Sequence, residues 1–285
     1  GSVTVSPGTA NTATTFSGSA GLTVTGANRV RLDPGSNLST ADGSISLTTA
    51  TYDASDSGAG VSLGADSALH STGYGSILID ATASTDQKSS GYAGLEVAQD
   101  AAIVTANGMV TLIAKAAGDK SSRPADITVA ARSVVTAGGG STLLFNADTL
   151  SVDSQDFSIS SPTGTIQFQP TSKKHDITLG SGGSGLSLDQ KFINGLTAAA
   201  LAFGGPGYDG TVSNTEALAP ANAGNISFQT TGSAVVGAAI TASGSIALTG
   251  GTVEVKGPLN TAASGNGGGV VIVATTGVVD ILPAG

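Results

Sequence analysis

Cysteine and tryptophan are absent from the 285 residues, and aromatic residues make up only 4% of the chain. Without cysteine there is no disulfide framework, so the fold must be held by its hydrophobic core and its backbone hydrogen bonds. Charged residues are also scarce, at 11% against roughly 25% in an average globular domain. A conventional charged surface is therefore missing, and serine, threonine, asparagine, glycine and alanine take its place.

Clusters of positive charge and long apolar runs are missing as well. The 11 lysine and arginine residues are scattered along a chain of net charge -9, which argues against a nucleic-acid partner and against a polybasic membrane anchor. No window approaches 18 apolar residues, so no membrane insertion is expected. A signal peptide is absent too. We interpret Gly1 and Ser2 as the remnant of a cleaved tag, which indicates a segment of a larger protein.

Glycine and aliphatic residues dominate what is present. The chain has 42 glycines and is 39% hydrophobic, a composition that fits many short strands joined by tight turns and does not fit disorder. Glycine and β-branched residues interrupt nearly every window of helical length. The sequence therefore predicts an all-β fold.

An internal repeat organises the chain over residues 60–83, 94–117 and 125–148. Each copy has an apolar-polar-apolar triplet, a small-residue corner, a hydrophobic pair, a glycine turn and a further alternating run. The first and last runs of a copy lie 16 positions apart, as Val61 and Ile77 do. By contrast, the similar runs at Leu22 and Ile45 are 23 positions apart. A fixed period predicts stacked supersecondary units.

These units predict a right-handed parallel β-helix, with residues 1–285 as a single β-helix segment. A turn of roughly 20 residues buries apolar surface worth about 12 kcal/mol, against an ordering cost of about 20–40 kcal/mol, so turns must stack to be stable. In the copy at 125–148 the expected inward residues are Ile127, Val129, Val134, Leu143 and Phe145.

Three insertions interrupt the pattern. Residues 82–91 and 117–125 are polar and charged, and we expect them to form loops on one side of the solenoid, where recognition is usually carried. Residues 180–205 form a Gly-rich and helical insertion. Apolar residues recur at helical spacing at Leu188, Phe192, Ile193 and Leu196. This spacing predicts a short helix near residues 189–196, with Ser187 capping its first turn and Asp189 near the positive end of its dipole.

A family resemblance is carried most specifically by residues 176–251. The run ITLG (177–180) is followed by GLSL (185–188), the short helix, an aliphatic strand and GNIS (224–227). This order resembles the filamentous-haemagglutinin-type surface proteins of Gram-negative bacteria, and the match covers most of the chain at the level of pattern. The N-terminal secretion domain of the best-known members is absent from this sequence.

The resemblance implies a large secreted β-solenoid repeat protein at the extracellular face of the bacterial cell. Its role would be structural and adhesive, in attachment to host or bacterial surfaces or in biofilm. It also implies that the parent chain is exported by a dedicated outer-membrane secretion partner.

Tyrosines are the candidate ligand-binding residues. Tyr52, Tyr74 and Tyr92 are separated by 22 and 18 positions, near one turn of the expected coil, so their rings can align along one edge. Such a row would suit the sugar rings of a glycan. In the competing interpretation, each tyrosine separately covers the end of a loop.

A carbohydrate-active β-helix enzyme, lyase-like or hydrolase-like, is the alternative function. Such enzymes cluster carboxylates on one outer face, and four aspartates near strand ends are candidates: Asp80, Asp100, Asp126 and Asp148. Aspartate at a strand end is also ordinary turn chemistry. The sequence offers no nucleophile elbow, so we predict no enzyme, no catalytic residues and no cofactor. An ice-binding threonine array is a third hypothesis, weakened by mixed residues at the outward positions of later units.

No metal site is predicted either. Residues 204–210 (GGPGYDG) match the start of a calcium-binding nonapeptide, but such sites form between tandem copies and only one is present. His70 and His175 lie far apart in sequence. Two groups of aspartates offer oxygen ligands that suit calcium: Asp53 with Asp56, and Asp148 with Asp153 and Asp156. We favour the interpretation that these are solvated carboxylates.

Overall fold

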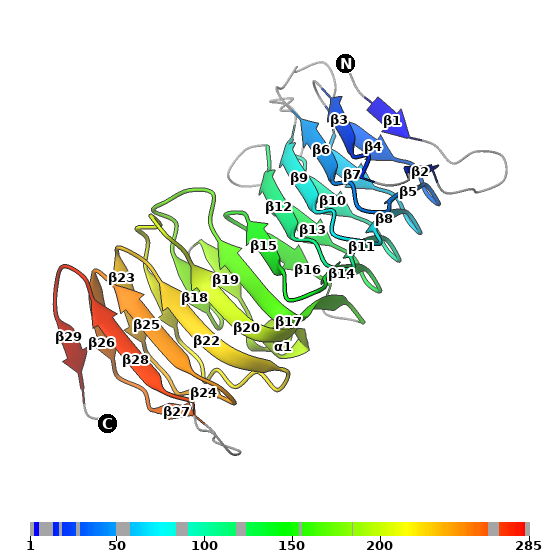
Figure 1. The fold of residues 1–285 in the computed structure, drawn as a ribbon. Helices are drawn as coiled ribbons and strands as arrows, with labels where there is room; N and C mark the ends of the chain where they lie inside the picture. The colour runs from blue at the N-terminus through cyan, green and yellow to red at the C-terminus, as the bar shows by residue number, and fades with distance from the viewer. Residues whose placement is uncertain are drawn as a thin grey trace.

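The computed structural model describes residues 3–5, 14–16, 19–26, 29–49, 58–83, 91–117, 124–153, 156–183, 185–261 and 268–282. Strands in these residues pair in parallel from one end of the chain to the other. Figure 1 shows them stacked as successive coils between the two termini. The predicted parallel β-helix is confirmed.

One side of the N-terminal half is a sheet of six short strands that stack in chain order. In β4, β7 and β10 the outer residues are buried and the middle residue points outward, as the period of a strand requires. We call this sheet the first face. Its strands are β1 (Val3–Val5), β4 (Val30–Leu32), β7 (Val61–Leu63), β10 (Leu95–Val97), β13 (Ile127–Val129) and β16 (Leu150–Val152).

Two further rows of strands close each coil, and both belong to one 15-stranded sheet. They are joined by β17 (Ser158–Gln169), whose beginning pairs with β14 and whose end pairs with β15. The second face contains β2 (Thr14–Phe16), β5 (Asn37–Thr40), β8 (Ala68–Ser71), β11 (Ala102–Thr105) and β14 (Val134–Ala137). The third face contains β3 (Leu22–Gly26), β6 (Ile45–Thr49), β9 (Ile77–Thr82), β12 (Val110–Lys115), β15 (Thr142–Asn146), β20 (Thr197–Gly204), β22 (Ala223–Gln229), β25 (Ile246–Gly250) and β28 (Val270–Ala274).

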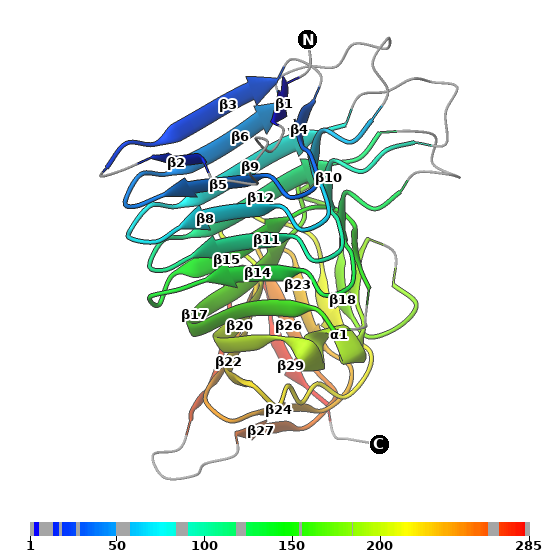
Figure 2. The ribbon, with the colours of Figure 1, turned by 90° about the vertical axis from the view of Figure 1, so that its right-hand side faces the viewer.

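The third face continues through the whole molecule, whereas separate sheets replace the other two faces after β16. Figure 2 shows the coils of both halves along the same stack. One replacement sheet has six strands: β19 (Leu186–Leu188), β18 (Ile177–Leu179), β21 (Val212–Asn214), β23 (Ser233–Val236), β26 (Thr252–Val255) and β29 (Val279–Ile281). The other has two strands: β24 (Ile240–Ala242) and β27 (Leu259–Thr261).

Coil length differs between the two halves. Val61 pairs with Leu95, and Leu95 pairs with Ile127, so these coils take 34 and 32 residues. Later, Ile226 pairs with Ile246, a coil of 20 residues. The expected turn of roughly 20 residues is therefore too short for the coils between Val61 and Ile127, which have longer corners, whereas the coil from Ile127 to Leu150 takes 23 residues.

The spacing of 16 positions is a step within one coil. Val61 lies in β7 on the first face and Ile77 lies in β9 on the third face of the same coil. The spacing of 16 is therefore the number of residues from the first face to the third face. The spacing of 23 positions is a full coil, because Leu22 pairs directly with Ile45.

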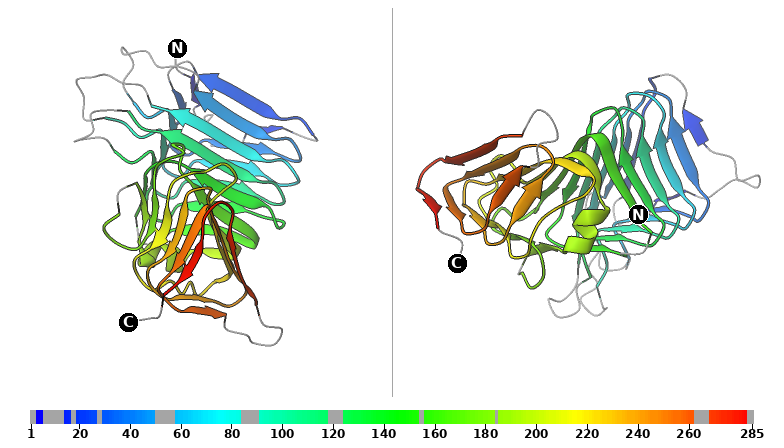
Figure 3. Two further views of the ribbon diagram at one scale, coloured as in Figure 1. Left: turned by 90° about the vertical axis from the view of Figure 1, so that its left-hand side faces the viewer. Right: turned by 90° about the horizontal axis from the view of Figure 1, so that it is seen from below.

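Residues 180–205 add an extra strand before they form the helix. β19 pairs in parallel with β18, with Leu186 opposite Ile177, and the short loop between these strands uses glycines with positive φ, Gly180 at 122° and Gly182 at 85°. The short helix follows as predicted, as α1 (Gln190–Gly195). Figure 3 shows α1 where the N-terminal and C-terminal coils meet.

The helix is capped by a residue other than the one expected. Asp189 is the N-cap, and its Oδ1 accepts a hydrogen bond from the Phe192 backbone N–H at 2.7 Å. Ser187 is held in β19, where its Oγ donates to the Gly180 carbonyl at 3.1 Å, so the prediction of Ser187 as the cap is wrong. Pairing of β19 with β18 delays the start of the helix until the strand has ended.

The two charged loop insertions fall largely outside the described residues, which leave out 84–90 and 118–123. Their described ends are joined. Tyr92 and Ala117 form an antiparallel bridge in which each backbone N–H donates to the other carbonyl at 3.0 Å. The end of the first insertion and the beginning of the second therefore meet at one corner, between the third and first faces.

Inward residues form continuous rows through the core. Four of the five expected residues of the repeat at 125–148 are buried: Ile127, Val129, Leu143 and Phe145. Val134 is only half-buried, and Val135 is buried in its place. The turn before β14 contains Arg132 at φ 59° and directs Ser133 inward, so the alternation restarts with Val134 facing outward.

Six of the seven phenylalanines form one connected set of ring contacts in this core, with Phe157 joined through Phe192 at 5.5 Å between ring centroids. Phe168 stacks on Phe145 at 5.2 Å and on Phe203 at 5.9 Å between ring centroids, with interplanar angles of 12°. Phe203 meets Phe228 edge-on at 5.8 Å, and Phe192 from α1 meets Phe168 edge-on at 5.7 Å. The scarce aromatic residues thus bind α1 to the coils.

The C-terminal coil leaves inward positions exposed. Val279 and Ile281 pair with the buried Val253 and Val255, yet they are 43% and 66% exposed. Among the described residues, no helix has the length and apolar character needed to cross a membrane.

Candidate functional site: a groove over the first face

Two open hollows lie over neighbouring strands of the first face, and together we call them the groove. The larger, of about 530 Å³, crosses the ends of β10, β13 and β16. The smaller, of about 290 Å³, lies over β4 and β7. Glu96 lines both hollows, so the groove runs along the stacking direction of the coils.

The floor of the groove is a row of outward side chains, one from each strand. Parallel pairing places these residues in direct register. With neighbouring strands about 4.8 Å apart, five strands give a row about 20 Å long. All five residues are polar: Arg31, Ser62, Glu96, Thr128 and Ser151.

One rim lies at the corner between the third and first faces. Tyr92 and Arg29 line the groove there, and Tyr92 is held through its two backbone hydrogen bonds to Ala117. A Cβ at Gly58 would lie 2.9 Å from Arg29 Nη1, so glycine at this position leaves room for the guanidinium.

The opposite rim is one turn repeated in successive coils. Each copy contains a residue in the left-handed region, where side chains are unfavourable and aspartate is better tolerated than most. The register of the adjoining strands stacks these residues in a column. The column consists of Gly35, Asp66, Asp100, Arg132 and Asp156, with φ between 58° and 76°.

Arg132 and Asp100 form an ion pair within this column. Arg132 Nε and Nη2 donate to Asp100 Oδ1 and Oδ2 at 2.7 and 2.6 Å. The Arg132 hydrogen bond lowers the pKa of Asp100. In turn the Asp100 hydrogen bond, helped by the charges of Asp100, Asp156 and Asp66, raises the pKa of Arg132. Nearer the floor, Arg31 Nε lies 2.9 Å from Asp33 Oδ1.

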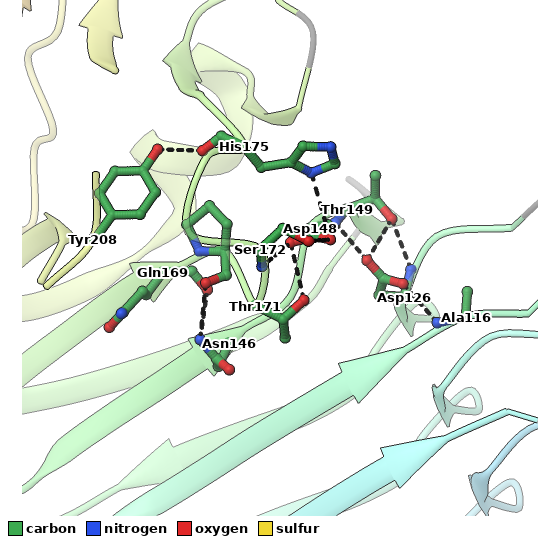
Figure 4. A network of polar contacts seen from close by, with 11 residues as sticks. Ala116, Asp126, Asn146, Asp148, Thr149, Gln169, Thr171, Ser172, His175 and Tyr208 are labelled. Carbon is green, nitrogen blue, oxygen red and sulfur yellow. Dashed lines mark hydrogen bonds and ion pairs between the residues drawn. The ribbon is translucent and has the colours of Figure 1, made fainter. Parts of the chain in front are cut away.

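A ladder of buried carboxylates ties successive coils together at the corner between the third and first faces (Figure 4). Asp126 accepts hydrogen bonds from the Ala116 N–H at 2.6 Å and from the Thr149 N–H at 2.9 Å. One coil further on, Asp148 Oδ1 accepts from the Ser172 N–H at 2.7 Å. These carboxylates accept backbone N–H groups at the corner, where the chain leaves the strand ladders.

Asp148 is surrounded by hydrogen-bond donors. Burial acts to raise its pKa, but hydrogen bonds from the Ser172 side chain and backbone and from Thr171, together with nearby His175, outweigh burial and lower it. Thr171 Oγ1 donates at 3.0 Å and Ser172 Oγ at 2.5 Å. Asp148 is therefore suited to stay ionised and unsuited to act as a general acid, which needs a raised pKa.

Serine, histidine and aspartate meet at this corner, but in the wrong order for nucleophilic catalysis. Ser172 Oγ donates directly to Asp148 Oδ2, and His175 Nδ1 lies 3.5 Å from the same oxygen. In a catalytic triad the histidine stands between the serine and the aspartate and takes the serine proton. Here the aspartate is the shared acceptor, so the cluster stabilises the corner.

The three candidate tyrosines do not form the expected row. Tyr52 lies outside the described residues. Tyr74 is 79% exposed in the turn between β8 and β9, a different corner of the coil from Tyr92. Of the two described tyrosines, Tyr92 lines the groove. Its ligand-binding role stays a prediction.

The four candidate carboxylates of the enzyme hypothesis do not share one cleft. Asp80 lies within β9 on the third face, Asp100 lies in the turn rim, and Asp126 and Asp148 form the buried ladder. The outward row of the third face is mixed as well, since Thr23 is followed in register by Ser46 and Leu78.

The calcium-like turn at residues 204–210 is filled by its own tyrosine. Tyr208 is fully buried and its hydroxyl donates to the carbonyls of His175 and Thr211. Burial, followed by the charges of Asp176 and Asp209, raises its pKa. In the described part of the chain, no group of three or more histidine, aspartate or glutamate residues is arranged to hold a metal ion. Asp53 and Asp56 fall outside that part.

No family model, curated protein or solved structure matches the chain. Function is therefore inferred from the groove and from the residues that line it.

Sequence reasoning missed Arg29, Arg31 and Glu96 as groove residues. Strand alternation places Arg31 and Glu96 outward. The sequence alone does not show whether neighbouring strands are 16 or 34 residues apart, and only the 34-residue coil places Ser62 beside Glu96. A signal for the turn rim was present, since Gly35, Asp66, Asp100 and Arg132 follow their triplets at the same position.

Proposed function

We propose that this chain is a structural and adhesive segment of a secreted bacterial surface protein, similar to the filamentous-haemagglutinin type. The open polar groove along the first face is the observation that carries the proposal. A rigid stack of coils can present many equivalent contacts, and their combined avidity exceeds the affinity of any one contact. The sequence pattern at 176–251 supports an extracellular location and export of the parent chain by an outer-membrane partner.

A carbohydrate-active enzyme receives less support from the same groove. None of the four candidate aspartates lines the groove. Asp100 belongs to the turn rim and Asp80 to β9 on the third face. Asp126 and Asp148 are engaged in the buried ladder.

Adhesion can be measured directly with beads coated with the purified chain. We expect saturable attachment to a bacterial biofilm or to epithelial cells, competed by excess soluble chain, while albumin-coated beads stay unattached. Attachment no greater than that of albumin on every surface would contradict the proposal. Release of reducing ends or unsaturated uronates from a polysaccharide panel would favour the enzyme instead.

A further inference from the structure

We propose that the groove over the first face binds a linear neutral polysaccharide along the stacking direction, with the Tyr92 ring against one sugar. This inference rests on the proposed function, because it names the ligand class of the adhesive surface. It is argued from the length of the groove, from its balance of charge and from the position of Tyr92.

The shape of the groove fits a polymer. Its two hollows are adjacent, since Glu96 lines both, and both are open to solvent, so a chain can lie along the groove and extend past it. The floor repeats once per strand, at about 4.8 Å, close to the length of one sugar unit. Successive sugars of an extended chain can therefore meet equivalent positions on successive coils.

Charge in the groove favours a neutral ligand. Arg29 and Arg31 line one part, while Glu96 and Asp153 line the other. A polyanion would meet the two carboxylates, and a polycation would meet the two guanidiniums. Sugar hydroxyls donate to carboxylates and accept from guanidiniums, so a neutral glycan can bond along the whole groove.

The hydroxyl residues of the floor add to this match. Ser62 and Thr128 lie on either side of Glu96 in direct register, and both kinds of hydroxyl donate and accept. The floor therefore offers a continuous row of groups that can exchange hydrogen bonds with a polyhydroxylated chain.

Tyr92 supplies the apolar contact that sugar binding needs. Tyr92 is half-buried and, like Ser62 and Glu96, is one of the residues that line the groove. The two backbone hydrogen bonds to Ala117 fix the position of the residue, so little order is lost on binding. A tyrosine ring offers one flat apolar face for the C–H groups of a sugar and a hydroxyl for its edge.

The test titrates the chain with cellohexaose, xylohexaose and mannohexaose by isothermal titration calorimetry, with cellobiose and hexagalacturonate for comparison. We expect at least one neutral hexasaccharide to bind at least about tenfold more tightly than cellobiose and than hexagalacturonate. Tyr92→Ala should weaken that binding at least about tenfold. Thr128→Lys, which places a long side chain across the floor, should weaken it similarly. Tyr74→Ala is the matched control, an exposed tyrosine at another corner, and should bind as the unmodified chain does.

Thermal unfolding of each variant checks the fold, and Thr128→Lys keeps the test decisive where Tyr92→Ala unfolds. The proposal is overturned by absence of neutral hexasaccharide binding, by preferred binding of hexagalacturonate, or by full binding in folded Tyr92→Ala and Thr128→Lys. Bead adhesion separates the two proposals. If beads carrying either groove variant still adhere, the groove is not the adhesive surface, while the proposed adhesive function is supported. Hexasaccharide binding by a chain whose beads do not adhere supports the groove and overturns the adhesive function.

Discussion

Single buried polar residues hold the corners of this coil. Asp126 and Asp148 each accept backbone N–H groups from a neighbouring strand or coil, which replaces ladder hydrogen bonds where the chain turns. An ionised acceptor makes such bonds about twice as strong as neutral ones. Because burial and hydrogen bonds act in opposite directions on the Asp148 pKa and the hydrogen bonds win, the fold favours its charged form.

Asp148 should make stability depend on acid pH. Its folded-state pKa is lowered, so its contribution is complete above the ordinary value of 3.8 and is lost as the pH falls through the folded value. Asp148→Asn should reduce the free energy of unfolding by about 2–3 kcal/mol at pH 7. The difference from the unmodified chain should shrink below about pH 3.8. Urea unfolding at several pH values measures both effects.

Asp80→Asn is the control for that experiment, because Asp80 lies on the outer side of β9. It should change stability by less than about 0.5 kcal/mol. A cost for Asp148→Asn that is the same at pH 7 and at pH 3 would contradict the assigned role of the Asp148 charge.

Among the secondary-structure elements, α1 and the phenylalanine rows belong to one packing unit. α1 has six residues, too few to be stable alone. It is held by its cap at Asp189 and by the contact of Phe192 with Phe168. Phe168 also stacks on rings from the coils before and after it, so it links the helix to the third face.

Phe168→Ala should therefore cost about 3–5 kcal/mol in the free energy of unfolding. Phe168→Leu fills most of the space and should cost about half as much or less. Circular dichroism during urea unfolding measures both variants. Both substitutions remove the aromatic ring, but only Phe168→Ala leaves a large cavity. Equal costs would therefore show that the cavity adds nothing to the loss of the ring, and would contradict this prediction.

At the scale of the whole molecule, stability comes from stacking, because each coil buries its apolar row against the next. The third face shows this most directly, since its strands pair without interruption from β3 to β28. The same principle leaves the C-terminal coil with the exposed inward residues Val279 and Ile281. Exposed apolar residues beside unpaired strand edges favour association between chains.

The double substitution Val279→Lys with Ile281→Lys should raise the concentration at which the purified chain self-associates by about tenfold or more. The melting temperature should change little, because no neighbouring coil covers these residues within the described part of the chain. Analytical ultracentrifugation over a concentration series measures the effect. Met109→Lys is the control, since Met109 is 44% exposed at a corner far from this end. Equal suppression by Met109→Lys would mean that added charge alone prevents association.

The sequence by itself determined the fold class and most of the core. Alternating runs such as Val61–Leu63 and Leu95–Val97 are strands, because apolar residues at every second position can be buried on one side only in an extended chain. Helix α1 was also predictable, since apolar spacing and a cap residue lie close together in the chain. These features depend on interactions between residues near one another in sequence.

Tertiary structure alone decided the coil length, the groove and the uses of the carboxylates. Whether Val61 lies beside Ile77 or beside Leu95 depends on how many faces one coil has, and the same local pattern fits both. Only the pairing of Val61 with Leu95 places Glu96 beside Ser62, and only stacking brings Ser172 to Asp148. Contacts between residues more than 20 positions apart depend on loop closure and corner geometry, which short-range patterns do not encode.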